Sequence, residues 1–274
     1  MMIPYYDFGG HGPLLHFAHS NGYPPACFRQ MAAPLLNNYH VVGICFRPLW
    51  PDSHPEELSS WRIMSDDLYH FIQQQGYKNI IGVGHSLGAV ATMKTAYQFP
   101  HLFRALILIE PVFMPPDFLN MLAINPELAK QYPLYQKTIN RRNTWPQRKD
   151  AFDHFRPKKV FHRWSDEALW DYINYGLHTN EQGEVELAFS REWEAQIYTK
   201  FPLDVWEEIP QVPQPTLAVR GADTDTLFPQ AWDLWQKLQP QATFIEIPDV
   251  GHMVPMERPQ TVAAIIADYL NKLD

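Results

Sequence analysis

The residues that decide the fold are 79–97, which read NIIGVGHSLGAVATMKTAY. The apolar run Asn79–Val83 is typical of a buried strand, and Ala89–Tyr97 is compatible with a helix. Between them stands Gly84-His85-Ser86-Leu87-Gly88. A serine on such a sharp turn is held in a strained backbone conformation, and glycines flank it because side chains there would clash with the neighbouring strand and helix. The pattern predicts that the Ser86 hydroxyl projects from a sheet edge, beside the N-terminal N–H groups of the new helix.

Further apolar, β-branched runs predict the other strands of this sheet: Leu14–Ala18, His40–Cys45, Ala105–Ile109, Thr216–Val219 and Thr243–Ile247. Residues 61–75 and 262–273 place apolar side chains three and four positions apart, which indicates amphipathic helices. Strands that alternate with helices and are apolar along their whole length favour an α/β fold. We predict a mostly parallel central sheet with helices on both faces.

The alternation stops after Ile109 and resumes at Thr216. The intervening stretch holds five of the nine tryptophans and lacks strand-like runs, but Asp166–Tyr175 and Arg191–Lys200 are compatible with helices. We therefore predict an α/β core formed by residues 1–111 and 211–274. The insertion, residues 112–210, is predicted to be a mainly helical cap and is called the cap segment below.

Composition narrows the class of protein. The chain has 274 residues, of which 46% are hydrophobic and 19% charged, as in a folded globular protein and unlike a disordered one. Its 22 basic and 30 acidic residues give a net charge of −8, which repels phosphate backbones and argues against a nucleic-acid partner. No apolar run approaches the roughly 20 residues of a membrane helix, and no cationic side chain precedes Arg29. We expect a cytoplasmic protein without an integral membrane segment; its oligomeric state stays open.

The sequence carries none of the common metal or cofactor motifs. Cys27 and Cys45 are the only cysteines and form no C-x-x-C pair, which argues against a disulfide framework and the common zinc modules. Two buried free thiols are expected. There is no H-E-x-x-H and no phosphate-binding G-x-x-x-x-G-K-[ST], and Gly82-x-Gly84 lacks its third glycine at position 87. We predict no metal and no cofactor.

A serine needs a base to take its proton and a carboxylate to orient that base. The predicted strand Thr243–Ile247 runs into Pro248-Asp249-Val250-Gly251-His252, so His252 stands on a loop from which its ring can reach Ser86. The acid should follow another strand end between these two residues. Asp225 is preferred because it follows the strand-ending Gly221 by a few residues. Asp223 instead suits the closing of the turn, and Glu110, directly after Ala105–Ile109, is the alternative triad acid or a buried helper.

Acyl transfer also needs donors for an oxyanion, normally two backbone amides. Residues 16–25, HFAHSNGYPP, end a predicted strand with a loop of small residues. We assign the Asn21 backbone N–H as the partner of the Leu87 N–H. His19 is expected to pin this loop instead of catalysing.

Together these motifs resemble the α/β-hydrolase superfamily, specifically its compact members with a helical cap after the sixth strand. The resemblance covers nearly the whole chain. It rests on His19-Ser20-Asn21-Gly22 in place of the family's oxyanion loop, on residues 84–88 as nucleophile elbow, on Asp225 as acid and on Gly251-His252 as base. Ser20 replaces the family's usual glycine, and Asp223 leaves the acid assignment open. A serine at the elbow differs from the epoxide hydrolase and haloalkane dehalogenase branches, which use aspartate there.

The residues and the resemblance predict a serine hydrolase that cleaves a small, largely apolar carboxylic ester through an acyl-enzyme intermediate. Carbon–carbon, thioester or amide cleavage and acyl transfer to another acceptor would use the same triad. Two readings from other classes are a non-catalytic small-ligand-binding protein and a scaffold whose basic cap docks a partner.

The cap segment also carries a basic stretch, which is favoured as a solvated surface over an anion-attracting patch. Its members are Lys137, Arg141, Arg142, Arg148, Lys149, Arg156, Lys158, Lys159 and Arg163. The interleaved aromatic residues more often form the core of such a cap than line a pocket. These are Trp145, Phe152, Phe155, Phe161 and Trp164.

Overall fold

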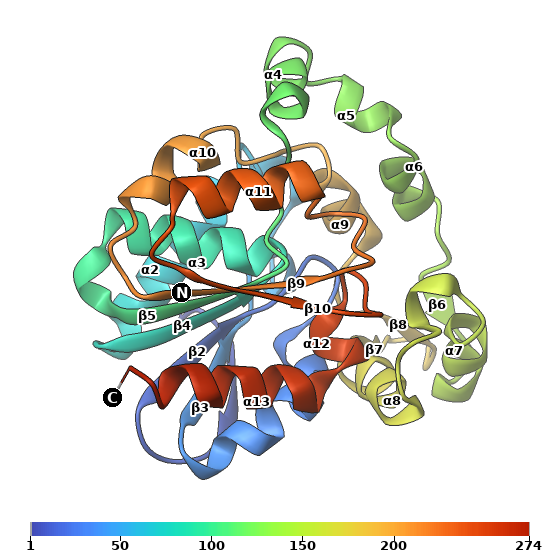
Figure 1. Cartoon of the computed structure of the whole chain (residues 1–274). Helices are drawn as coiled ribbons and strands as arrows, with labels where there is room; N and C mark the ends of the chain where they lie inside the picture. Colours follow the sequence, from blue (N-terminus) through green and yellow to red (C-terminus); the bar gives the residue numbers. More distant parts are fainter. Residues whose placement is uncertain (1, 274) are drawn as a thin grey trace.

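A seven-stranded sheet runs through the centre of the computed structural model, which describes residues 2–273 (Figure 1). The strand order is β1-β3-β2-β4-β5-β9-β10, and every neighbouring pair is parallel except β1 with β3. The predicted strands all form, which confirms the α/β architecture. They are β2 (Leu14–Ala18), β3 (His40–Ile44), β4 (Ile80–His85), β5 (Phe103–Ile109), β9 (Thr216–Gly221) and β10 (Thr243–Ile247).

Helices cover both faces of the sheet because successive strand residues point to opposite sides. Leu15 and Phe17 belong to one buried apolar cluster, whereas Ala18 belongs to the other. The first face is covered by α1 (Arg29–Ala32) and α13 (Pro259–Leu270), and the second by α2 (Arg62–Gln75), α3 (Leu87–Gln98) and α11 (Pro229–Leu238). The helices predicted over 61–75 and 262–273 are therefore α2 and α13, the latter beginning at Pro259. Short 3₁₀ helices complete the core at Pro25–Phe28, Ala33–Asn37, Arg47–Leu49, Pro55–Glu57, Pro100–Leu102 and Ile209–Gln211.

The edge strand β1 (Tyr5–Gly9) was missing from the sequence prediction. It pairs antiparallel with β3 and is only half-buried, so it lacks the continuous apolar run that marks the inner strands. A register irregularity between Asp7 and Gly9 further interrupts its pattern.

The cap segment is mainly helical, as its sequence indicates. It contains α4 (Pro116–Ile124), α5 (Leu128–Gln131), α6 (Pro133–Ile139), α7 (Arg148–Phe155), the 3₁₀ helix Lys159–Phe161, α8 (Asp166–Tyr175), α9 (Arg191–Ile197) and α10 (Val205–Glu208). Its sequence has no strand-like runs, yet the segment also contains three short strands. A small antiparallel sheet forms in the order β6-β8-β7, from β6 (Thr144–Trp145), β8 (Val185–Leu187) and β7 (Leu177–Thr179). Strands of two or three residues are too short to show a period in the sequence.

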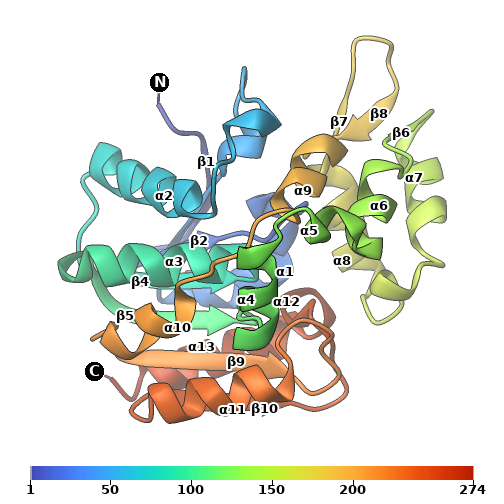
Figure 2. The ribbon, with the colours of Figure 1, turned by 90° about the horizontal axis from the view of Figure 1, so that it is seen from above.

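The cap segment lies beside the edge of the main sheet at which the parallel strands end (Figure 2). Three contacts tie it to loops of that edge: Asn21 to Glu194, Arg163 to Asp223, and the Tyr23 ring to Trp164. The predicted aromatic core is present, since Trp145, Phe155, Phe161 and Trp164 are all buried, at 0% to 4% exposure. Within residues 2–273, no helix is long and apolar enough to cross a membrane.

Candidate active site

Ser86 occupies the strained turn that the glycine pattern predicts. It stands between β4 and α3 with φ 57° and ψ −119°, a conformation that side chains rarely adopt. A Cβ added at Gly84 would lie 2.5 Å from the carbonyl oxygen of Gly88, and one at Gly88 would lie 2.1 Å from that of Ala18. Both positions therefore require glycine for close backbone approach. The turn places Ser86 at the carboxyl edge of the sheet, where it is 6% exposed.

His252 connects this serine to a buried carboxylate. Its Nε2 lies 3.0 Å from Ser86 Oγ, and its Nδ1 lies 3.0 Å from Glu110 Oε2. Because an ionised carboxylate only accepts hydrogen bonds, Nδ1 carries the proton and Nε2 accepts from the serine hydroxyl. The three groups form one hydrogen-bonded chain, assembled from the ends of β4, β5 and the loop after β10.

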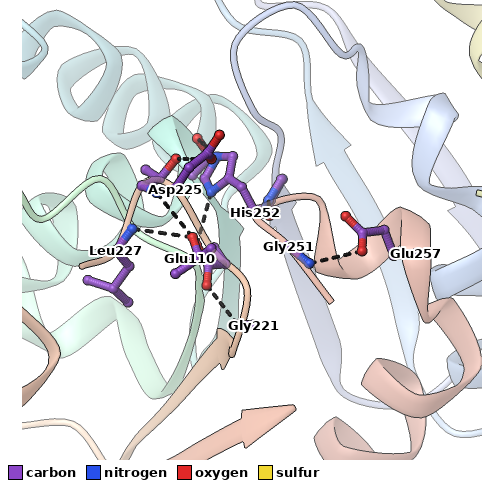
Figure 3. A network of polar contacts seen from close by, with 11 residues as sticks. Glu110, Gly221, Asp225, Leu227, Gly251, His252 and Glu257 are labelled. Atoms are coloured by element: carbon purple, nitrogen blue, oxygen red, sulfur yellow. Dashed lines mark hydrogen bonds and ion pairs between the residues drawn. The ribbon is translucent and has the colours of Figure 1, made fainter. Parts of the chain in front are cut away.

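Glu110 is held in a single orientation by its other donors (Figure 3). Its Oε1 accepts from the Gly221 N–H at 2.7 Å, and its Oε2 accepts from the Thr224 hydroxyl at 2.6 Å as well as from His252. The residue is fully buried at 0% exposure. Its backbone is also unusual, with φ 48°, directly beyond the last residue of β5.

The first choice of Asp225 as the residue that orients His252 is therefore corrected to Glu110. Asp225 is exposed, and its carboxylate accepts a hydrogen bond from the Thr226 hydroxyl at 3.4 Å and none from His252 in the part of the chain that the structure describes. Asp223 is turned to the cap segment, where it forms an ion pair with Arg163 at 2.5 Å. Both aspartates lie on the loop that follows β9, while Glu110 comes from β5, which neighbours the strand that carries Ser86.

The backbone of His252 is fixed by the residue that precedes the serine. His85 Nε2 donates to the His252 carbonyl at 2.9 Å, and the two ring centroids are 5.1 Å apart. Burial, assisted by the nearby His252, lowers the pKa of His85 to about 3, so the His85 ring stays neutral. The sequence motif of residues 84–88 does not predict a role for His85. A histidine beside the serine gives no signal of the partner it meets 167 residues away.

The loop after β2 lies against the start of α3, as the close approach of Gly88 to Ala18 shows. His19 pins this loop: its Nδ1 donates to the Ser20 carbonyl at 2.8 Å, and its Nε2 accepts from the Phe46 N–H at 3.1 Å. Burial lowers the pKa of His19 to about 4. The Asn21 side chain donates to the Glu194 carbonyl at 3.1 Å, which anchors the loop to α9. His19 therefore holds the loop in place through both ring nitrogens, as predicted.

The basic stretch is a solvated surface only in part: Lys137, Arg142, Lys149 and Lys159 are exposed, whereas two of its arginines are engaged within the protein. Arg148 donates to the carbonyls of Ile173 and Leu177, and Arg156 to those of Phe161 and Trp164. These two side chains satisfy backbone carbonyl groups inside the cap segment, where an unpaired carbonyl would lower the stability of the fold.

The remaining candidates for chemistry are the thiols. Cys27 is buried as expected, whereas Cys45 is half-buried. Burial raises the pKa of both, that of Cys45 to about 12, which removes the thiolate needed for nucleophilic attack. In residues 2–273, no group of three or more histidine, cysteine or acidic side chains is placed to hold a metal ion.

Comparison with known proteins places this site in context. Residues 17–265 match the model of the alpha/beta hydrolase family. Abhydrolase domain-containing protein AKT2 of Alternaria alternata is 27% identical over 229 residues, covering 70% of this chain and 83% of that protein.

Solved structures show the same fold. E-2-(acetamidomethylene)succinate hydrolase superposes with a TM-score of 0.80 at 19% identity, over 98% of this chain and 95% of that chain. A thermophilic esterase from Thermogutta terrifontis has a TM-score of 0.71 at 20% identity, over 98% and 93% of the two chains.

Proposed function

The chain belongs to the alpha/beta hydrolase family, and we propose that it is a serine hydrolase that cleaves a small carboxylic ester through an acyl-enzyme intermediate. The observation that carries this proposal is the hydrogen-bonded chain from Ser86 through His252 to Glu110. Both hydrogen bonds are 3.0 Å long, which suits proton transfer from a serine to a histidine that a carboxylate orients.

In the proposed mechanism, Nε2 of His252 takes the proton of Ser86 as the hydroxyl oxygen attacks the ester carbonyl. Glu110 holds the ring and stabilises the imidazolium that forms. The tetrahedral oxyanion is stabilised by the backbone N–H groups of Asn21 and Leu87. Leu87 is the first residue of α3, so its N–H has no partner within the helix.

The intermediate collapses when His252 returns the proton to the leaving alcohol, which departs and leaves an acyl group on Ser86. Water then enters, gives a proton to His252 and attacks the acyl carbonyl. Release of the carboxylic acid restores the serine hydroxyl. No further group is needed for this cycle.

A series of p-nitrophenyl esters of increasing acyl length tests the proposal. We expect wild type to release p-nitrophenolate with a rapid initial burst stoichiometric with enzyme if deacylation is the slower step. Ser86→Ala should lose at least about a thousandfold in kcat. Ser59→Ala, a change at an exposed serine, is the matched control and should keep wild-type rates.

Two outcomes would contradict ester hydrolysis. Undiminished turnover in Ser86→Ala would exclude the serine as nucleophile. A folded wild type that is inactive on every ester, but active on a thioester, an amide, a diketone or an acyl acceptor other than water, would keep the site and change the reaction.

A further inference from the structure

A cluster of polar side chains, four from the cap segment and one from the loop after β2, lies beside Asn21. It consists of Tyr23, Arg141, Tyr172, Glu194 and Tyr198 and is called the cap cluster below. Tyr23 follows β2, Arg141 follows α6, Tyr172 lies on α8, and the other two lie on α9 or directly after it. Four separate segments thus bring their polar groups to one place.

The cap cluster touches the loop of the proposed oxyanion site directly. A Cβ at Gly22 would lie 2.9 Å from Glu194 Oε2, so the carboxylate rests on that glycine. The Asn21 side chain donates to the Glu194 carbonyl at 3.1 Å. A group bound in the cap cluster would therefore be a close neighbour of an acyl group on Ser86.

Arg141 supplies the cation of the cluster, and Glu194 is its partner. Its guanidinium forms an ion pair with Glu194 through Nη2, and Nη1 lies 3.2 Å from Oε1. Burial lowers the pKa of Arg141, but Glu194 and the three tyrosines together outweigh it and raise the pKa of the arginine above its ordinary value. Burial raises the pKa of Glu194, and Arg141 offsets this only in part. Arg141 therefore remains a cation.

Several donors of the cluster have no acceptor. Nε of Arg141 is buried and has no hydrogen-bond partner among residues 2–273. Nη2, which faces Glu194 in the ion pair, likewise makes no hydrogen bond among these residues. The rings of Tyr23 and Tyr172 lie 5.2 Å apart, and Tyr172 is only 2% exposed. A buried donor without a partner requires a physical explanation. Burial raises the pKa of both tyrosines, which keeps the hydroxyls as donors.

We propose that the cap cluster binds a carboxylate carried by the substrate, so that the ester cleaved at Ser86 is anionic instead of largely apolar. This inference rests on the function proposed above. A carboxylate accepts several hydrogen bonds and suits a planar guanidinium. It would accept from Arg141 Nε–H and from the hydroxyls of Tyr23 and Tyr172, while Glu194 holds the other side of the guanidinium in place.

A matched pair of substrates tests the subsite. Mono-p-nitrophenyl succinate and p-nitrophenyl 4-oxopentanoate have acyl chains of similar length and differ in a carboxylate against a methyl ketone. We expect wild type to prefer the succinate ester in kcat/KM by about ten- to a hundredfold, as is typical of hydrogen bonds to a charged group. The preference should disappear in the double variant Arg141→Gln/Glu194→Gln, which removes both charges and leaves none unpaired.

Arg142→Gln is the matched control, since it removes the adjacent arginine, which is exposed and donates to the Thr144 carbonyl. It should keep the wild-type preference. If wild type cleaves both esters equally, or if the double variant keeps the preference, the subsite is wrong while ester hydrolysis stands.

Binding to Ser86→Ala separates the two proposals. Calorimetry of Ser86→Ala should show that monomethyl succinate binds at least about tenfold more tightly than methyl 4-oxopentanoate. Adding Arg141→Gln/Glu194→Gln to this variant should abolish the binding of monomethyl succinate. Such binding in a wild type that cleaves neither ester would overturn the hydrolase proposal and support the subsite. Absence of Arg141-dependent binding would overturn the subsite.

Discussion

Glu110 Oε2 lies 3.0 Å from Nδ1 of His252, although 142 residues separate the two in the chain. The contact exists because β5, β9 and β10 are parallel neighbours, so that the residues following their carboxyl ends meet at one edge of the sheet. The Glu110 side chain reaches the histidine and is also held by the Gly221 N–H at the end of β9 and by the Thr224 hydroxyl on the loop that follows.

Replacing each of the three candidate acids by its amide tests this contact. Glu110→Gln should lower kcat by about a thousandfold or more, because the neutral amide no longer stabilises the imidazolium. Asp225→Asn and Asp223→Asn are matched controls that remove a charge from the neighbouring loop and should stay within a few-fold of wild type. The measurement is steady-state hydrolysis of a p-nitrophenyl ester at saturating substrate. A collapse in Asp225→Asn alone would return the role of acid to that residue.

The hydrogen bond from His85 to the His252 carbonyl should position the catalytic ring. His85→Phe removes the donor and is expected to lower kcat about tenfold with little change in KM, since a misplaced base costs rate more than binding. His85→Gln retains a donor and should recover part of the loss. Equal rates in His85→Phe and wild type would show that the contact has no effect on the reaction.

Gly88 should tolerate no side chain. In Gly88→Ala, the new Cβ would lie 2.1 Å from the Ala18 carbonyl oxygen, so α3 and the loop after β2 must separate. We expect a loss of at least about 2 kcal/mol in the free energy of unfolding and a loss of esterase activity.

Gly183→Ala is the comparison variant for Gly88, because Gly183 has φ 81° but open space around it. It should cost only about 1–2 kcal/mol from backbone strain and leave the activity unchanged. Urea unfolding together with ester hydrolysis measures both effects. Equal behaviour of the two variants would refute the steric explanation.

Acid stability should depend on His16, which is fully buried with neither ring nitrogen hydrogen-bonded within the described residues. Burial, assisted by His19, lowers its pKa from 6.5 to about 3. Between these values the unfolded chain binds a proton that the folded chain does not. The stability that this group contributes is therefore complete above pH 6.5 and is lost as the pH falls towards 3, by about 1.4 kcal/mol per pH unit.

His16→Leu removes this titration and should flatten the decline in unfolding free energy between pH 6.5 and 4 by about that amount. Its control is His178→Gln, a change at an exposed histidine, which should keep the wild-type slope. Urea unfolding at several pH values gives the slopes. An unchanged slope in His16→Leu would show that the buried ring does not couple folding to protons.

The inner strands and the serine turn were predictable because their causes are local. A parallel strand buried on both faces needs a continuous apolar run, and a turn as tight as that at Ser86 needs glycine at positions 84 and 88. Strand β1 and the strands of the small sheet escaped prediction, since an exposed edge strand and pairs of two or three residues leave no such run.

The choice among Asp225, Asp223 and Glu110 had no local cause. All three residues follow strands, and the sequence ranks them only by their spacing from the strand end. Which side chain meets His252 depends on how the loop after β9 turns away from the sheet. The same holds for the cap cluster, whose arginine was grouped with a basic stretch until its contact with Glu194 separated it from that group. By itself, the sequence determined the order of the inner strands along the chain and the strained turn at Ser86, because these depend on neighbours within a few residues. Only the tertiary structure decided the acid and the cap cluster, because each is a meeting of distant segments whose distances local patterns do not encode.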